Sequence, residues 1–239
     1  MAGETITSEA ICVAIAPWSR TSHVVTWLTP AGRVVTVAKG AVRPKSFLLG
    51  QYDLNYTCEI VYYARAKAEV HALRSCFALL RRDGLRDDYR ALALAGYFRR
   101  LASSFAPHGP DAEQWYALLS ESLSALATPD EDSSLPRASR EILKLLQFEL
   151  KSLQLLGLSA ELEAASGSIT LSGERRMPVS PEVAALLRDP TRPIKNPRIL
   201  LDAARVIGVF YKFHADCACD VRRTVLAMRG KTKEGLDSI

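Results

Sequence analysis

Residues 24–38 read VVTWLTPAGRVVTVA. Two runs rich in β-branched residues, 24–28 and 33–38, flank the turn signal Thr29-Pro30-Ala31-Gly32. β-branched side chains pack well on pleated strands, whereas Pro and Gly favour turns. The stretch therefore predicts two consecutive strands joined by a short connection.

Three more runs in the first 80 residues have strand character. β-branched and apolar residues fill 6–16, and a fifth run covers about 69–77. Between residues 54 and 62, apolar and polar residues alternate with the period of a half-buried strand. Five short strands with turn signals between them favour a small β-barrel such as an oligonucleotide-binding (OB) fold. The periodicity is equally compatible with an SH3-like barrel.

After Asp83-Gly84 the apolar period becomes helical. Helices are predicted over 89–101, about 111–127, about 136–156, 181–188 and 197 to about 228, with at most a short strand at 168–171 and a frayed tail at 230–239. The broad apolar stripe of the third helix suits the centre of a helical bundle. The fold class is therefore predicted to be α+β, with an OB-fold β-barrel domain over 1–80 followed by a helical domain over 81–239.

Composition limits the class of protein. Of the 239 residues 48% are hydrophobic and 24% are charged, which excludes an intrinsically disordered chain. No apolar run approaches the roughly 18 residues of a membrane span, and the N-terminus lacks the pattern of a signal peptide. The five cysteines are odd in number and fit reduced thiols better than a disulfide framework. We therefore expect a cytoplasmic protein without a membrane partner.

The basic residues are unevenly distributed. The net charge is only +5, but between Ala10 and Tyr52 five basic residues occur and no carboxylate does. Basic clusters without neighbouring acids neutralise phosphates, which is the main source of non-specific affinity for nucleic acids. The alternative is a solvated basic face without a partner.

The run that follows the quoted stretch carries a resemblance. Residues 29–33 lead through a strand to residues 38–46, AKGAVRPKS. This order resembles the "T-P-x-G-R … A-K-G-A-x-R-P-K-S" run in the N-terminal OB domain of the RecO family of bacterial recombination mediators. The likeness continues through YRALALAGY at 89–97 and LQFELKSLQLLG at 146–157, and it covers most of the chain in order.

One departure from the family concerns zinc. Many members carry a four-cysteine zinc ribbon directly after the helix that matches 146–157. Here the following residues contain neither Cys nor His before Val179. A structural zinc site needs four nitrogen or sulfur ligands. The resemblance therefore implies a zinc-free member, in which 161–180 is a loop or hairpin remnant of the ribbon.

Other chemistry finds little support. His214, Cys217 and Cys219 lie close together in the sequence, but on a helix the two cysteines point in opposite directions and cannot share one ion. Gly230-Lys231-Thr232 lacks the earlier glycine of a phosphate-binding loop. None of the four histidines adjoins a nucleophile motif. We predict no enzyme activity, no cofactor and no metal.

The candidate DNA-binding residues are basic side chains on the predicted barrel. They are Arg20, Arg33, Lys39, Arg43, Lys45, Arg65 and Lys67. Trp18, Tyr52 and Tyr63 are candidates for stacking on bases, with packing inside the barrel as the alternative. Because nothing resembles a base-reading helix, we expect binding to single- and double-stranded DNA without sequence specificity.

The resemblance also implies partners. The RecO family binds the acidic C-terminal tail of the single-stranded DNA-binding protein SSB, binds the ring protein RecR, anneals complementary strands and helps to load RecA, which would place the protein at the nucleoid. An acidic tail needs Arg or Lys around an apolar pocket. The candidates in the helices are Arg99, Arg100, Arg137 and Arg140, each of which is alternatively a solvated helix residue. Three more candidates, Arg192, Lys195 and Arg198, lie in a basic segment that joins two predicted helices and could contact either DNA or the acidic tail. The competing function is a helical protein-interaction adaptor whose barrel no longer binds DNA.

Overall fold

The structure is a computed structural model. It describes residues 4–64, 68–109, 111–128, 135–158, 167–172, 175–194, 196–214, 222 and 226. Contacts divide the chain into two compact units, one formed by 1–87 with 102–127 and the other by 88–101 with 128–239. The predicted division into an OB-fold domain over 1–80 and a helical domain over 81–239 stays a prediction.

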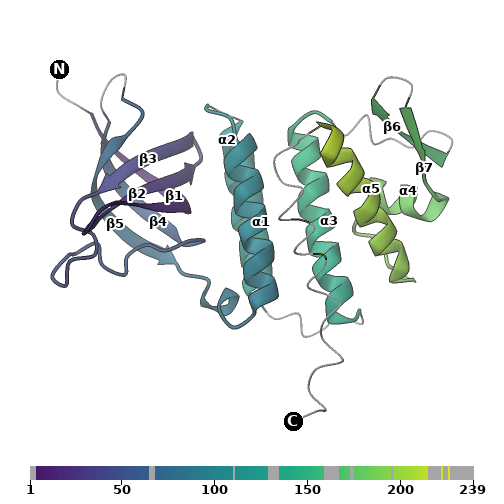
Figure 1. Ribbon diagram of the computed structural model, residues 1–239, viewed down its shortest axis with the longest axis horizontal. Helices are drawn as coiled ribbons and strands as arrows, with labels where there is room; N and C mark the ends of the chain where they lie inside the picture. The colour runs from purple at the N-terminus through teal and green to yellow at the C-terminus, as the bar shows by residue number, and fades with distance from the viewer. Residues whose placement is uncertain are drawn as a thin grey trace, which may run out of the picture. The chain divides into compact units, whose positions relative to one another are not determined.

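Five strands form a closed barrel in the order β1-β2-β3-β5-β4 (Figure 1). They are β1 (Glu4–Ser19), β2 (Ser22–Thr29), β3 (Gly32–Ala38), β4 (Thr57–Ala64) and β5 (His71–Leu80). β1 is long enough to pair with β4 through its first half and with β2 through its second half. All pairs are antiparallel except β3 with β5. The five predicted strands are confirmed, and their order is that of an OB-fold.

The barrel core explains where the alternation prediction succeeds and where it fails. Cys58, Ile60 and Tyr62 are buried while Glu59 is exposed, as the period-2 pattern predicts. The strand begins only at Thr57, however, and Leu54 is exposed. Asn55 has φ 70°, a left-handed conformation that interrupts an extended strand. The fourth strand was therefore predicted to begin three residues too early.

Within the first unit, Arg82 connects the barrel to α2 (Ala112–Ala127). This buried side chain donates hydrogen bonds to the Asn55 carbonyl (2.8 Å), to Thr57 Oγ1 (2.9 Å) and to Ser120 and Ser124 on α2. Burial lowers the pKa of Arg82. The guanidinium thus joins the start of β4 to α2 through neutral acceptors.

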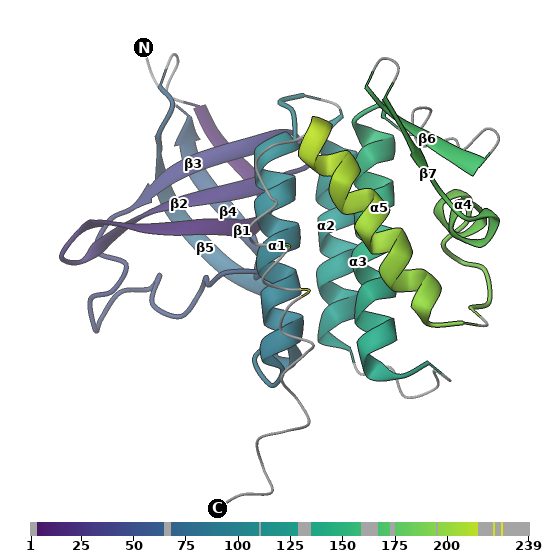
Figure 2. The same cartoon turned by 45° about the vertical axis from the view of Figure 1, so that its right-hand side comes forward.

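The second unit contains most of the helical region. Its elements are the first part of α1 (Tyr89–Phe105), α3 (Arg137–Leu155), β6 (Ser168–Ser172), β7 (Arg175–Pro178), α4 (Pro181–Arg188) and α5 (Arg198–His214), seen in Figure 2. Phe98 stacks on Phe148 with ring centroids 4.0 Å apart. The helical spacing in 89–101 predicts a stripe that includes Tyr89, Leu92, Tyr97 and Leu101. Tyr97 and Leu101 are buried as predicted, whereas Tyr89 and Leu92 are exposed. The helix instead also buries Leu94 and Phe98.

A buried charge lies in this second unit. Glu149 on α3 is 0% exposed and accepts hydrogen bonds from Tyr97 Oη (2.7 Å) and Arg222 Nε (2.6 Å). Arg222 also donates to the Ala204 carbonyl at 2.5 Å. Burial lowers the pKa of Arg222, but the Glu149 carboxylate outweighs that effect and the net shift is upward. The pair holds one residue of the C-terminal segment against the helices.

The hairpin β6–β7 occupies the described part of the expected zinc-ribbon remnant. Of the two forms expected for the remnant, a loop or a hairpin, the structure has the hairpin, and β7 is the strand that local periodicity did not indicate. The predicted helix 197–228 is confirmed as α5 up to His214, and most of its later residues, with the tail 230–239, lie outside the described residues. Across the described residues, no helix combines the length and the apolar character required to cross a membrane.

Candidate nucleic-acid interface

Two loops meet at one end of the barrel. The turn between β1 and β2 contains Arg20 and Thr21, and the loop 39–56 follows β3. Val42 N donates to the Thr21 carbonyl (3.3 Å), and Gly40 N donates to Ser22 Oγ (3.0 Å). Figures 1 and 2 both show the two loops side by side. We call this region, residues 17–22 and 39–49, the loop end.

Successive turns shape the loop 39–56. Arg43 N donates to the Gly40 carbonyl (3.1 Å), and Ser46 N donates to the Arg43 carbonyl (2.9 Å). Ala41 and Leu48 are buried in the barrel core and anchor the loop. The side chains between these anchors are therefore directed outward, and those of Arg43 and Lys45 are exposed.

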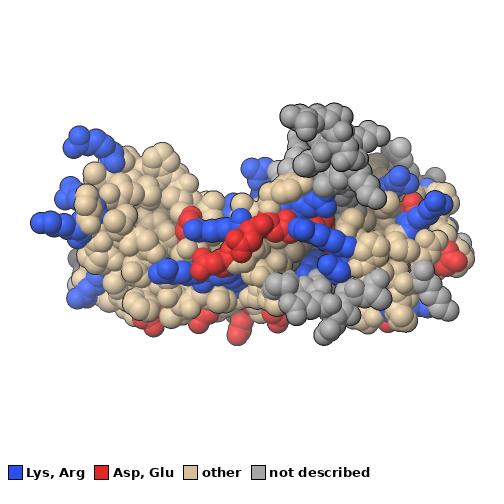
Figure 3. All heavy atoms as spheres, turned by 90° about the horizontal axis from the view of Figure 1, so that it is seen from below, with Lys and Arg blue, Asp and Glu red and all other residues tan. Residues whose placement is uncertain are grey.

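The loop end concentrates positive charge. Arg20, Lys39, Arg43 and Lys45 are all exposed. Within the part of the chain that the structure describes, none of the four forms an ion pair with a carboxylate. In the view of Figure 3 this end of the barrel carries blue side chains and no red ones. The arrangement suits a phosphate backbone, which would supply the missing negative charge.

The structure separates Arg33 from these four cations. Arg33 opens β3 beside Gly32, whereas Lys39 follows its last residue, so the two lie about 20 Å apart along the strand. A side chain at Gly32 would approach His108, which places Arg33 near the connection between α1 and α2. Arg65 and Lys67 lie outside the described residues. The predicted site is thus only partly brought together.

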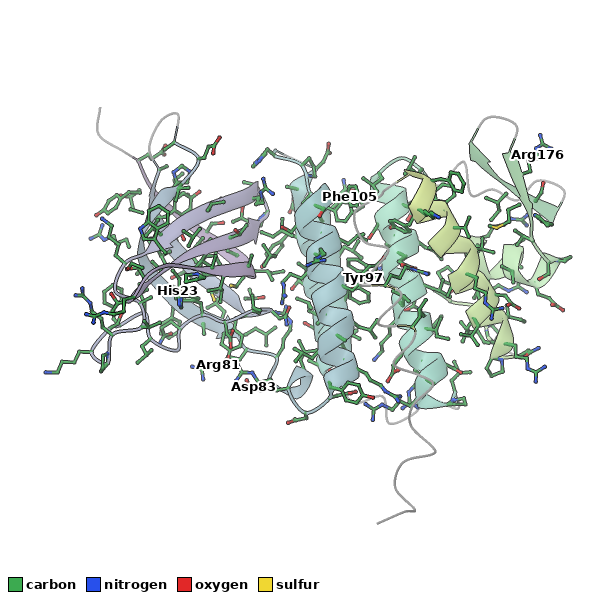
Figure 4. All side chains as sticks on the ribbon, in the orientation of Figure 1. His23, Arg81, Asp83, Tyr97, Phe105 and Arg176 are labelled. Carbon is green, nitrogen blue, oxygen red and sulfur yellow. The ribbon has the colours of Figure 1, made fainter. Side chains whose placement is uncertain are left out.

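The three stacking candidates have different surroundings. Trp18 is 64% exposed at the loop end. Tyr52 is half-buried and packs edge-on against Trp27. It also shares a hydrogen bond of 2.9 Å with Nδ1 of His23, which is labelled in Figure 4. Burial, followed by the nearby thiols of Cys12 and Cys76, raises the pKa of Tyr52. Tyr52 therefore has the packing role that the alternative describes.

Tyr63 lies on the outer face of β4 rather than at the loop end. The guanidinium of Arg74 covers its ring at 5.6 Å from the centroid. Phe47, which the sequence reasoning omitted, is 68% exposed within the loop 39–56. Phe47 directly follows the RecO-like run 38–46, but the sequence alone does not show that its side chain is exposed.

The candidate partner residues are dispersed over the second unit. Arg137 is ion-paired with Asp88 and with Glu141 (3.2 Å), and Arg140 donates to the Leu135 carbonyl (2.9 Å). Arg100, Arg192 and Arg198 are exposed, Arg99 is partly buried, and Lys195 lies outside the described residues. The contacts of Arg137 and Arg140 are already those of helix stabilisation, so these two have the weakest geometric support.

The described residues are also relevant to the predictions about metal binding and reactive thiols. There, no group of three or more His, Cys, Asp or Glu is arranged to hold a metal ion. Cys217 and Cys219 lie outside this part of the chain. In the barrel, a hydrogen bond with Cys58, followed by burial, raises the pKa of Cys76, which favours the protonated thiol.

Known proteins resemble this chain over most of its length. The family model for "Recombination protein O C terminal" matches residues 86–218. DNA repair protein RecO of Desulforudis audaxviator is 32% identical over 136 residues, which cover 57% of this chain and 50% of that relative. DNA repair protein RecO of Geobacter metallireducens is 29% identical over 204 residues, 77% of this chain and 79% of the relative.

A third similar protein has the same name. DNA repair protein RecO of Moorella thermoacetica is 27% identical over 182 residues, 75% of this chain and 64% of the relative. The matched part of the chain thus spans half of the Desulforudis protein and more of the other two. Because the family model covers more than half of the chain and the barrel precedes the helices as expected, the chain belongs to the RecO family.

Proposed function

We propose that this protein is a non-enzymatic recombination mediator in DNA repair, which binds single- and double-stranded DNA without sequence specificity through its barrel. The observation that carries the proposal is the loop end, where four exposed cations gather without a paired carboxylate among the described residues. Electrostatic contact of this kind attracts any phosphate backbone and reads no base edges.

Strand annealing follows from the same chemistry. Two complementary single strands repel each other, and a surface that neutralises phosphates lowers that repulsion without ATP. Membership of the RecO family supports annealing, RecA loading and contacts with RecR and the SSB tail. For the tail, exposed arginines of the second unit such as Arg100, Arg192 and Arg198 are the better placed candidates.

The test is an annealing assay with complementary oligonucleotides in the absence of ATP. We expect the wild-type protein to accelerate annealing and the double variant Arg43→Glu/Lys45→Glu to lose most of that activity. The matched control is Arg33→Glu, because this residue is also exposed and basic but lies at the opposite end of β3. Equal losses in both variants would show that the overall charge, rather than the loop end, determines annealing. A wild-type protein that neither binds nor anneals DNA would favour the adaptor function.

A further inference from the structure

We propose that Trp18 and Phe47 stack on unpaired bases and thereby make the loop end prefer single-stranded over double-stranded DNA. The inference rests on the proposed function, because it requires DNA to bind at the loop end. It adds a second kind of contact, in which the cations hold phosphates and the aromatic rings hold bases.

The geometry of β1 directs Trp18 outward. Pro17 pairs with His23 and Ser19 pairs with Ser22, with a register shift between them, so Trp18 has no partner residue on β2. Bulges of this type redirect a side chain and are frequent next to functional sites. The indole remains 64% exposed at a position next to the turn that carries Arg20.

The loop after β3 presents Phe47 in a comparable way. Leu48 is 2% exposed and anchors the loop in the barrel core, while Ser46 Oγ accepts a hydrogen bond from Leu48 N at 3.3 Å. Phe47 lies between these two fixed residues and is 68% exposed. Two large rings are thus exposed to water at the loop end, Trp18 at the end of β1 and Phe47 on the loop after β3, although covering either ring would be favourable.

The surrounding charge indicates what covers them. The loop end also carries four exposed cations, Arg20 in the turn after β1 and Lys39, Arg43 and Lys45 in the loop after β3. None of them has a carboxylate partner within the described ranges. An apolar protein surface would leave these cations uncompensated, whereas a nucleic acid supplies phosphates and aromatic bases together. We therefore assign the rings to bases.

The form of the DNA decides whether the rings contribute. In a duplex the faces of the bases are stacked on one another, so only phosphates and groove edges are accessible. In a single strand the faces are open, and aromatic side chains stack on them independently of sequence. The rings should consequently add affinity for single strands only, while the cations add affinity for both forms.

The tryptophans offer a selective reporter. The chain has three, and Trp27 and Trp115 are 0% and 2% exposed. Acrylamide, a neutral quencher, should therefore reach Trp18 almost alone. We expect saturating oligo-dT to protect Trp18 from acrylamide, and a duplex of equal length to leave the quenching nearly unchanged.

Affinity measurements with variants complete the test. Trp18→Ala and Phe47→Ala should each weaken binding of oligo-dT by about 5- to 100-fold and change binding of the duplex less than about twofold. The matched control is Phe77→Ala, because Phe77 is 64% exposed but lies on β5 outside the loop end. It should change neither affinity.

The outcomes separate the two proposals. One outcome would overturn this inference and leave the proposed function intact. In it, Arg43→Glu/Lys45→Glu loses binding of both single- and double-stranded DNA, while Trp18→Ala and Phe47→Ala keep the wild-type ratio of the two affinities. Loss of RecR binding by the aromatic variants with normal DNA discrimination would assign the rings to a protein contact and also overturn it. A wild-type protein that binds neither DNA form would overturn both proposals.

Discussion

Arginine has opposite roles at the loop end and at the buried pair of Arg222 with Glu149. At the loop end, Arg20 and Arg43 are exposed and have no carboxylate partner among the described residues. In the second unit, Arg222 is 6% exposed and bound to the fully buried Glu149. The comparison teaches that burial and pairing, rather than residue type, distinguish a charge that stabilises the fold from one that is available to a ligand.

The physical basis is the cost of desolvation. A buried charge must be compensated within the protein, because water no longer solvates it. An exposed charge costs little to maintain and contributes little to stability, so it can be used for binding. Variants at the two places should therefore differ in which measurement they affect.

The largest expected effect is at the buried pair. Arg222→Met should lower the free energy of unfolding by about 3–5 kcal/mol, because Glu149 is left buried and unpaired. Urea unfolding followed by circular dichroism measures it. The control Arg205→Ala breaks the exposed pair with Asp202 (3.0 Å) and should cost at most about 1 kcal/mol. Equal losses in the two variants would contradict the special role of burial.

Arg82 sharpens the comparison, because it is buried but hydrogen-bonds neutral acceptors. Arg82→Met should cost about 2–3 kcal/mol of unfolding free energy, since the Asn55 carbonyl and Thr57 Oγ1 lose their donor. Thermal and urea unfolding would show it. Binding of DNA by the folded variant should be unchanged, and a large drop in affinity would argue that Arg82 positions the site.

Salt dependence measures the exposed cations. If all four neutralise phosphates, log affinity for single strands should fall with log salt at a slope of roughly −2.8. Arg43→Ala/Lys45→Ala should reduce the magnitude of the slope by about 1.4. Fluorescence anisotropy with a labelled oligonucleotide gives both values. A slope that is the same in the variant would remove these two residues from the interface.

The smallest effect is on stability at the loop end. Arg43→Ala/Lys45→Ala should change the free energy of unfolding by no more than about 0.5 kcal/mol, because both side chains are exposed. The same urea series measures it. A larger loss would show that these residues also support the fold and would weaken the contrast between the loop end and the buried pair.

Local patterns predicted most of the elements correctly. The strands and helices follow from periodicity and turn residues, which act over a few positions. The apolar face of α1 was harder to predict because apolar residues surround it, with Leu92 exposed and Leu94 buried two positions apart. Periodicity cannot choose between two apolar flanks, and the choice depends on what packs against each.

The sequence predicted the basic residues of the candidate site, but it did not predict which of them lie close together. Arg43 and Lys45 belong to the motif that carries the family resemblance, so they were found from the sequence. Arg33 was grouped with them, although the length of β3 separates it from Lys39. Phe47 was omitted, because only the buried anchor Leu48 shows that its neighbour is directed into solvent.

By itself, the sequence determined the order of barrel and helices, the carboxylate-free basic stretch and the absence of zinc ligands where the family often has them. The tertiary structure decided which charges are exposed together and which are buried in pairs. Glu149 and Arg222 are 73 positions apart, and no local rule joins them. The reason is that hydrogen bonding within an element is local, whereas desolvation depends on every residue that the fold brings near.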